Sequence, residues 1–387
     1  MKSILVVSPY GSEYGPRRAL EHVARAVRLA GFRLICVVPS ADAISPGLAA
    51  LEPDIRILAS LDTLHRTFDP RLIYRLVRDH CGAVAAIARL ARAEDAAAVY
   101  TISEAVLAGG MAARRVGLPS ATHVIGLSIR TPRLLGRTYI PLLNRFSSRF
   151  VACSTAAMTM LTDNGVDRDA IDLVHNSISV DAVESAAHRP SPLPPNGPRV
   201  GMLAAYDPRK GHDLFVAAAA LVAQSHPETR FYLIGGVLDT RPESAAFELA
   251  VRRSIETDGL TDRVEQVGFV ASAELYAWIR ALDVVVAPSR TEGFAHALLE
   301  AMACGRPIVA TAVEGNLDAI ADGESGLLVD VTPEAIAVGI SSLLDDPRRA
   351  AALGDAAYLR VAARFDDRIS IPLLAESIAN LASIGAP

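Results

Sequence analysis

Short apolar runs rich in β-branched residues alternate along this chain with longer amphipathic stretches, and glycine-bearing turns join the two. In the first half, the run Ile4–Ser8 leads into a predicted helix over residues 17–30 and then into a second run at Leu34–Val38. Apolar runs of this length, separated by helices, are typical of parallel strands that are buried on both faces. Because βαβ crossovers are right-handed, the pattern predicts an α/β protein with doubly wound sheets.

The same order of elements returns in the second half. A predicted strand at Val200–Leu203 is followed by a turn with Gly211 and by a helix over Leu214–Gln224. A final helix is expected over Arg368–Ile384. Further strands are predicted at Arg230–Ile234, Val264–Val270, Val284–Ala287 and Ile308–Ala310.

A proline-rich segment divides the two halves. The chain has 387 residues, whereas a single core seldom exceeds about 300 residues. Residues 189–198 contain five prolines, which neither a helix nor a central strand tolerates. We therefore predict a Rossmann-like domain over 1–188, a linker over 189–198, a second Rossmann-like domain over 199–367, and a last helix over 368–387 that crosses back to the first domain. The carboxyl ends of the strands are expected to line a cleft between the domains.

The composition favours a cytoplasmic protein. The four cysteines stand far apart without a C-x-x-C pair, which argues against a disulfide framework or a structural zinc site. The first nine residues contain too short an apolar run for a signal peptide. The longest clean apolar run, Leu214–Ala223, is about half of the roughly 20 residues that a membrane helix needs.

Charge is shared unevenly between the halves. The net charge of −5 combines +6 over residues 1–180 with −11 over residues 181–387, which indicates either an anionic partner for the first half or a solvated arginine-rich surface. Basic and apolar residues interleave over 65–80 and 130–149. Two interpretations stay open: peripheral contact with the inner face of a membrane, or ordinary amphipathic helices of a folded domain. Nucleic acid is not expected, because few aromatic residues accompany the basic ones.

One stretch carries most of the chemistry. A predicted strand ends at Pro288, a loop carries Glu292, Gly293 and Phe294, and a helix follows over 295–304. The amide groups of residues 293–297 would form an anion site suited to a diphosphate. Glu292 and Glu300 would lie about 12 Å apart along a helix. Because paired glycosidase acids are roughly 5–10 Å apart, we expect the two to hold different parts of one long ligand.

This stretch resembles the E-x7-E signature of family 4 glycosyltransferases, retaining sugar-nucleotide enzymes of the GT-B fold. The resemblance covers nearly all of residues 197–345 and is thinner over 1–180. It implies a first domain that binds the acceptor and a second that binds the nucleotide-sugar donor. Other segments resemble family motifs in the same order: Val174–Ile178, Gly201–Asp213, Leu233–Gly236, Leu260–Val264, Val267–Val270, Ile308–Thr311 and Gly323–Leu328.

The resemblance also implies roles for single residues. Glu300 would bind the ribose hydroxyls and Glu292 the hydroxyls of the donor sugar. The backbone around Gly293–Phe294 would bind sugar and diphosphate, and Val270 would meet the base. Lys210 matches the lysine that neutralises the leaving diphosphate, an electrostatic form of catalysis.

Two positions depart from the family pattern. Ala205 stands where the family has an arginine, five residues before Lys210. Arg209 and Arg290 are candidates for the missing charge, although neither position matches the motif. Ala295 stands where the family has a glycine. Its Cβ atom would keep a sugar farther from the backbone at this substrate-binding position than a glycine would.

In the first half, the loop Pro9–Gly15 resembles a family glycine loop that faces the diphosphate, and Gly11 is its closest equivalent. His123 is our candidate for a family histidine at the reaction centre, with His175 and His296 as alternatives. Asp167-Arg-Asp169 follows a turn, so we interpret it as a helix cap and expect no metal.

The resulting hypothesis is a metal-independent, retaining glycosyltransferase of the hexosyltransferase type. It would need no cofactor, only a nucleotide-diphosphate sugar as co-substrate. The acceptor hydroxyl would belong to a sugar, a lipid-linked molecule or a small molecule, in glycan, polysaccharide, glycolipid or glycosylated-metabolite biosynthesis. Two alternatives stay open: a nucleotide-sugar binding protein that has lost transfer, and a nucleotide-sugar epimerase of the same fold. A dehydrogenase is disfavoured because no G-x-G-x-x-G follows the first strand.

Overall fold

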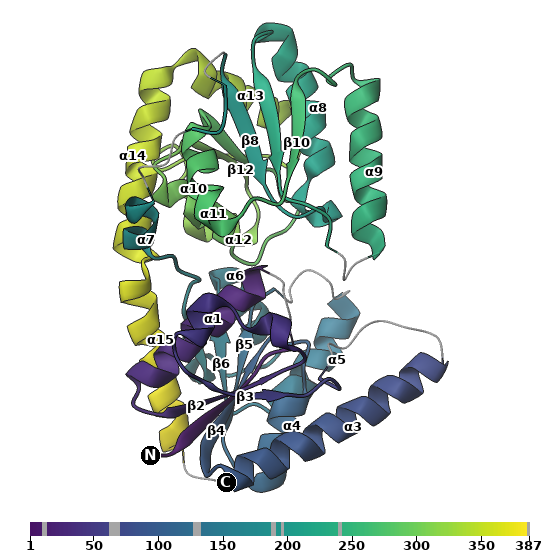
Figure 1. The fold of residues 1–387 in the computed structure, drawn as a ribbon, viewed down its shortest axis with the longest axis vertical. Helices are drawn as coiled ribbons and strands as arrows, with labels where there is room; N and C mark the ends of the chain where they lie inside the picture. The colour runs from purple at the N-terminus through teal and green to yellow at the C-terminus, as the bar shows by residue number, and fades with distance from the viewer. Residues whose placement is uncertain are drawn as a thin grey trace. The chain divides into compact units, whose positions relative to one another are not determined.

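A computed structural model of the chain describes residues 1–9, 14–61, 70–126, 133–186, 191–194, 197–238 and 242–384. Its contacts divide the chain into two compact units. Unit 1 comprises Met1–Asn176 and Arg368–Pro387, and unit 2 comprises Ser177–Asp367. Each unit is an α/β domain with helices on both faces of one sheet (Figure 1).

Within the described residues, unit 1 contains a seven-stranded parallel sheet of order β3-β2-β1-β4-β5-β6-β7. The order reverses between β1 and β4, which is the topological switch point of a doubly wound sheet. The strands are β1 (Ser3–Val7), β2 (Arg33–Val38), β3 (Asp54–Ile57), β4 (Ala96–Ile102), β5 (Ser120–Val124), β6 (Arg149–Ala152) and β7 (Ile171–Leu173). The helices are α1 (Tyr14–Leu29), α2 (Pro46–Ala49), α3 (Pro70–Ala93), α4 (Ala108–Val116), α5 (Arg133–Asn144), α6 (Thr155–Asp163) and α15 (Asp367–Ser383).

The inner strands of unit 1 bury side chains on both faces of the sheet, because successive side chains point in opposite directions. On β1, Ile4 and Val6 pack with α1 and α15, whereas Leu5 and Val7 pack with α3 and α4. This double burial explains why β1 and β2 have continuous apolar sequences rather than alternating ones.

Helix α15 is part of the core of unit 1. Ile378 and Leu381 are fully buried and share one apolar cluster with Val23 of α1. The Ser377 hydroxyl donates a hydrogen bond of 2.6 Å to the carboxylate of Asp172, at β7. The last helix therefore joins an apolar layer that begins with the first residues of the chain.

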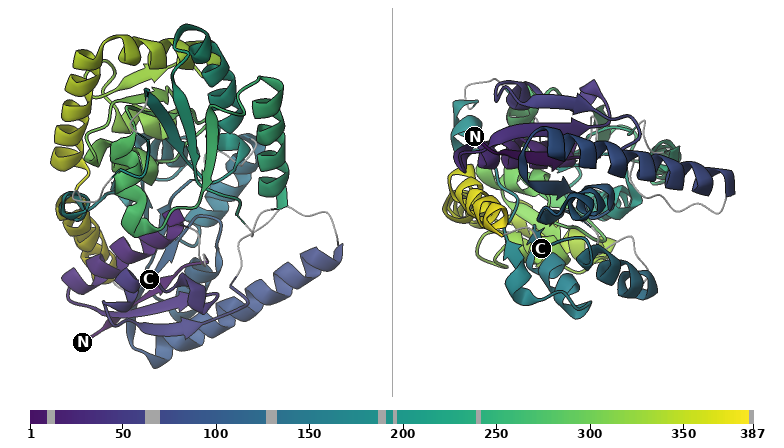
Figure 2. Two further views of the ribbon diagram at one scale, coloured as in Figure 1. Left: turned by 45° about the horizontal axis from the view of Figure 1, so that its top comes forward. Right: turned by 90° about the horizontal axis from the view of Figure 1, so that it is seen from below.

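Within the described residues, unit 2 contains a six-stranded parallel sheet of order β10-β9-β8-β11-β12-β13, which reverses between β8 and β11. Figure 2 shows this sheet and its helices from a second side. The strands are β8 (Arg199–Leu203), β9 (Arg230–Ile234), β10 (Val264–Gly268), β11 (Val284–Ala287), β12 (Ile308–Thr311) and β13 (Leu327–Val329). The helices are α7 (Val180–Ser185), α8 (His212–Ser225), α9 (Pro242–Thr257), α10 (Ser272–Ala281), α11 (His296–Ala303), α12 (Glu314–Ala319), α13 (Pro333–Asp345) and α14 (Pro347–Arg364).

The boundary between the units falls at residues 176 and 177, before the proline-rich segment 189–198. Ile178 explains this position: its amide donates to the Phe365 carbonyl at 2.9 Å, and its carbonyl accepts from the Asp367 amide at 3.0 Å. The Ser177 hydroxyl also donates to Asp367 at 2.8 Å. These bonds tie the segment after 176 to unit 2.

The doubly wound α/β prediction is confirmed, and the strands at 230–234 and 284–287 have the predicted bounds. The strand predicted over 264–270 ends at Gly268, whose φ of 77° leaves the extended region. The helix predicted over 65–80 corresponds to α3, which runs on to Ala93; residues 62–69 lie outside the described residues. In the part of the chain that the structure describes, no helix is both long and apolar enough to cross a bilayer.

Truncating Ile378 tests the place of α15 in the core of unit 1. Ile378 is fully buried, so Ile378→Ala is expected to lower the free energy of unfolding by about 3 kcal/mol. Leu373→Ala is the matched control, since Leu373 lies on the same helix with 48% of its surface exposed. Urea unfolding followed by circular dichroism measures both losses. Equal losses for the two variants would contradict the packing described here.

Candidate active site

The residues predicted to bind the diphosphate lie at the carboxyl ends of two neighbouring strands of unit 2. Lys210 ends a short 3₁₀ helix, Pro208–Lys210, in the connection after β8. Glu292 lies in the loop between β11 and α11. Strands β8 and β11 pair in parallel at the point where the strand order reverses. In open α/β sheets, ligands bind at this point.

Main-chain contacts join the two loops closely. The Arg290 amide donates to the Arg209 carbonyl at 2.7 Å, and the Arg290 guanidinium donates to the Pro208 carbonyl at 2.9 Å. Gly211 has a φ of 74°, and a Cβ atom there would lie 2.0 Å from the Pro288 carbonyl oxygen. Only glycine accommodates both the conformation and the close approach.

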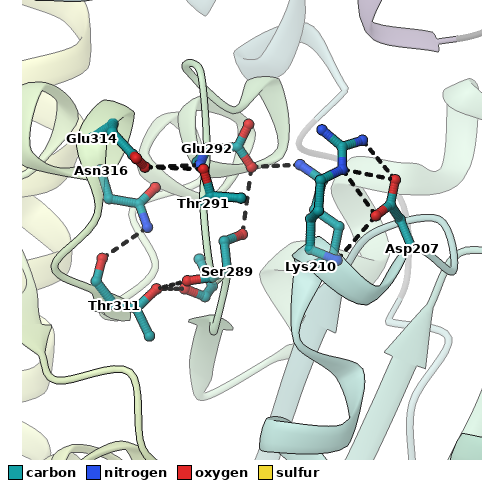
Figure 3. A network of polar contacts seen from close by, with 10 residues as sticks. Asp207, Lys210, Ser289, Thr291, Glu292, Thr311, Glu314 and Asn316 are labelled. Atoms are coloured by element: carbon teal, nitrogen blue, oxygen red, sulfur yellow. Dashed lines mark hydrogen bonds and ion pairs between the residues drawn. The ribbon is translucent and has the colours of Figure 1, made fainter. Parts of the chain in front are cut away.

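An ion pair between Lys210 and Glu292 connects the same two loops (Figure 3). The Lys210 ammonium group contacts Oε2 of Glu292, and the Ser289 hydroxyl donates to the same oxygen at 3.4 Å. The Glu292 side chain is only 11% exposed. Sequence analysis selected both residues but did not predict their pairing, because 82 positions separate them in the chain.

Glu314, the first residue of α12, holds the backbone of Glu292. Its Oε2 atom accepts hydrogen bonds from the Glu292 amide at 3.2 Å and from the Thr291 hydroxyl at 3.3 Å. The Gly315 amide donates to the Glu292 carbonyl at 3.0 Å. Sequence analysis missed Glu314, because no local pattern marks it. The close approach at the neighbouring Gly315, where a Cβ atom would lie 2.2 Å from the Gly293 carbonyl oxygen, is visible only in the structure.

A buried polar layer lies beneath these loops. The Thr311 hydroxyl, at the end of β12, donates to the main-chain carbonyls of Ser289 and Ala287. The Asn316 amide group donates to the Thr311 carbonyl at 2.9 Å. Thr311 and Asn316 are fully buried. This layer fixes the end of β12 against the loop that carries Glu292 (Figure 3).

The two arginines considered for the missing charge both pair with carboxylates of unit 2. Arg209 binds Asp207 through two nitrogens, at 3.0 and 2.6 Å. Arg290 binds Asp213 in the same way, at 2.8 and 2.6 Å, and these hydrogen bonds raise the pKa of its guanidinium. A role of Arg209 in substrate binding stays a prediction.

Helix α11 begins at His296, and Ala295 at its N-cap position makes no side-chain cap. Glu292 therefore precedes the helix, and the 12 Å estimate along a helix does not describe its separation from Glu300. Glu300 lies inside α11 with 1% of its surface exposed, so it is not an ordinary solvated helix residue. Phe294 is buried and meets the Phe365 ring edge-on, with centroids 5.2 Å apart.

The other predicted site residues lie in different surroundings. Val270 is partly buried and follows β10, next to Phe269, which is 66% exposed. Gly11 lies outside the described residues. Asp167 caps a 3₁₀ helix, accepting from the Asp169 amide at 3.0 Å, as predicted. In the described ranges, no group of three or more His, Cys, Asp or Glu side chains could hold a metal ion.

His123 lies inside strand β5 of unit 1. It is 4% exposed, and its Nδ1 atom lies 3.2 Å from the Tyr100 hydroxyl. Burial, with a smaller effect of His22, lowers the pKa of His123 to about 4, so the imidazole is neutral at pH 7. Its assignment to the reaction centre stays a prediction. The two alternative histidines lie in other surroundings: His175 is partly buried and follows β7, whereas His296 is the first residue of α11 and is 8% exposed.

Known proteins resemble this chain in sequence and in fold. The family model described as glycosyl transferases group 1 matches residues 183–360, all within unit 2. The D-inositol 3-phosphate glycosyltransferase of Pseudarthrobacter chlorophenolicus is 33% identical over 222 residues, 55% of this chain and 51% of the relative. The chain thus matches about half the length of this curated relative.

Solved structures match the whole chain at lower identity. HepE of Anabaena in complex with UDP gives a TM-score of 0.78 at 22% identity, covering 98% of this chain and 100% of that one. The sucrose-phosphate synthase of Thermosynechococcus elongatus gives a TM-score of 0.79 at 21% identity, covering 98% of each chain. At such identities the likeness shows the fold alone. Residues 183–360 of this chain therefore belong to the glycosyl transferases group 1 family, as the resemblance to family 4 predicted, and its two parallel Rossmann-like sheets have the GT-B fold.

Proposed function

We propose that the chain is a retaining glycosyltransferase that moves a sugar from a nucleoside-diphosphate donor to a hydroxyl acceptor. The observation that carries the proposal is the Lys210–Glu292 ion pair at the carboxyl ends of β8 and β11. Glu292 lies in the loop that leads into α11, where Ala295 at the N-cap position makes no side-chain cap. A cation beside the N-terminus of a helix suits a diphosphate.

In this proposal, Lys210 and the amides of residues 293–297 stabilise the negative charge that develops on the departing diphosphate. Glu292 binds hydroxyls of the donor sugar, and Glu300 binds the ribose. The bond between the anomeric carbon and the phosphate oxygen breaks. The acceptor oxygen bonds to that carbon on the same face, and a phosphate oxygen takes the acceptor's proton. No enzyme nucleophile takes part, and Lys210 serves where a metal ion could otherwise stabilise the diphosphate.

A UDP-sugar is the first donor to test. HepE of Anabaena, which shares this fold, has been crystallised with UDP and with UDP-glucose. An inositol phosphate is the first acceptor to test, because several sequence relatives carry the name D-inositol 3-phosphate glycosyltransferase. The net charge of +6 over residues 1–180 suits a phosphorylated acceptor. Peripheral membrane contact through 65–80 and 130–149 stays a prediction, since parts of both stretches lie outside the described residues.

A nucleotide-sugar binding protein that has lost transfer is the second candidate. Ala205 replaces the usual arginine, and both Arg209 and Arg290 pair with aspartates. These pairs reduce the positive charge available to a diphosphate. Binding of a nucleoside diphosphate without turnover of any donor, slow hydrolysis included, would favour this candidate.

Replacing Lys210 tests the catalytic role of its charge. Lys210→Ala is expected to lower turnover at saturating donor by about 100-fold or more, because an electrostatic contact to the leaving group is lost. Initial rates of nucleoside-diphosphate release measure the effect. Arg253→Ala is the control, since Arg253 is an exposed cation on α9. Unchanged turnover in Lys210→Ala would remove the assignment.

Replacing Glu300 tests the contact with the ribose. Glu300→Gln keeps the volume of the buried side chain and removes its charge, so nucleoside-diphosphate affinity is expected to fall about tenfold. Turnover of bound donor should change less. Calorimetric titration with UDP, GDP and ADP measures the affinity, and Glu256→Gln, at an exposed position of α9, is the matched control. An affinity equal to that of the wild type would show that Glu300 does not bind the ribose.

A further inference from the structure

Glu314 is a carboxylate in the candidate active site to which sequence analysis gave no role. It begins α12, directly after β12 and its short connection. Its side chain crosses to the loop after β11 and accepts hydrogen bonds from the Glu292 amide at 3.2 Å and the Thr291 hydroxyl at 3.3 Å. A carboxylate that accepts two hydrogen bonds is a stronger anchor than a neutral acceptor.

Consecutive residues 314 and 315 hold both polar groups of the Glu292 main chain. Glu314 accepts from its amide, and the Gly315 amide donates to its carbonyl at 3.0 Å. These two bonds fix the direction in which the Glu292 side chain leaves the backbone. The close approach has no room for a side chain at Gly315, where a Cβ atom would lie 2.2 Å from the Gly293 carbonyl oxygen.

The Glu292 side chain is held separately, by Lys210 and Ser289. Figure 3 shows the resulting order of contacts, with Glu314 on one side of Glu292 and Lys210 on the other. Glu314 thus acts on the Glu292 backbone, and Lys210 on its carboxylate. Replacing Glu314 would therefore alter the orientation of the Glu292 carboxylate, while Lys210 and Glu292 themselves stay unchanged.

We propose that Glu314 is a positioning residue that aims Glu292 at the hydroxyls of the donor sugar. This role rests on the proposed function, in which Glu292 contacts the sugar. Glu314 bonds to Thr291 and Glu292, whereas the ribose is assigned to Glu300, inside α11. Losing the Glu314 carboxylate should therefore weaken recognition of the sugar and spare recognition of the nucleotide. A side chain that only supported the loop would weaken both together or neither.

The experiment compares two affinities in each variant by calorimetry. The probes are UDP, GDP and ADP, each alone and as its glucose and N-acetylglucosamine conjugates. For the nucleotide that the wild type binds, Glu314→Ala is expected to weaken the conjugate about tenfold and the free diphosphate less than twofold. Glu314→Gln keeps an acceptor oxygen and should therefore retain most of the wild-type affinity for the conjugate. Glu228→Ala, at an exposed glutamate in the turn before β9, is the control and should change neither affinity.

A double-mutant cycle with Glu292→Gln completes the test. Because Glu314 acts through Glu292, the double variant should lose no more affinity for the conjugate than Glu292→Gln alone. Hydrogen exchange on the protein without additions should be faster at residues 290–295 in Glu314→Ala than in the wild type. Equal losses for diphosphate and conjugate, additive losses in the cycle, or unchanged exchange would each overturn the positioning role. A wild type that binds none of the probes would instead refute the proposed function, and the positioning role with it.

Discussion

The ion pair between Lys210 and Glu292 is the interaction on which the candidate site depends. It joins the connections that follow two adjacent parallel strands, β8 and β11. Opposite charges in a partly buried setting attract more strongly than charges in water, so the ion pair holds the two loops against each other. Only a glycine fits at position 211 against the Pro288 carbonyl, and this close approach brings the loops near enough for the ion pair to form.

Much of the fold could be predicted because the inner strands of both sheets are buried on both faces. An inner strand such as β11 is then apolar along its whole length, and this pattern is visible in the sequence. The motif around Glu292 was equally visible, since its loop and the following helix are contiguous in the chain. Local information of this kind placed Lys210, Glu292 and Glu300 in the unit that the family match covers.

The rest of the site could not be predicted because it depends on contacts between distant segments. Glu314 reaches Glu292 from another connection of the sheet, and no local pattern distinguishes it from a surface glutamate at the start of a helix. The aspartates that bind Arg209 and Arg290 are visible only in three dimensions. His123 illustrates the same limit, because its place within a fully buried strand is visible only in the structure.

A crystal structure with a bound nucleotide sugar measures the central claim most directly, namely that the loops after β8 and β11 receive a diphosphate. We predict phosphate oxygens within hydrogen-bonding distance of the Lys210 ammonium group and of amides in residues 293–297, with the sugar beside Glu292. Electron density for the diphosphate at any other place in the protein, with Lys210 and Glu292 still bound only to each other, would contradict it.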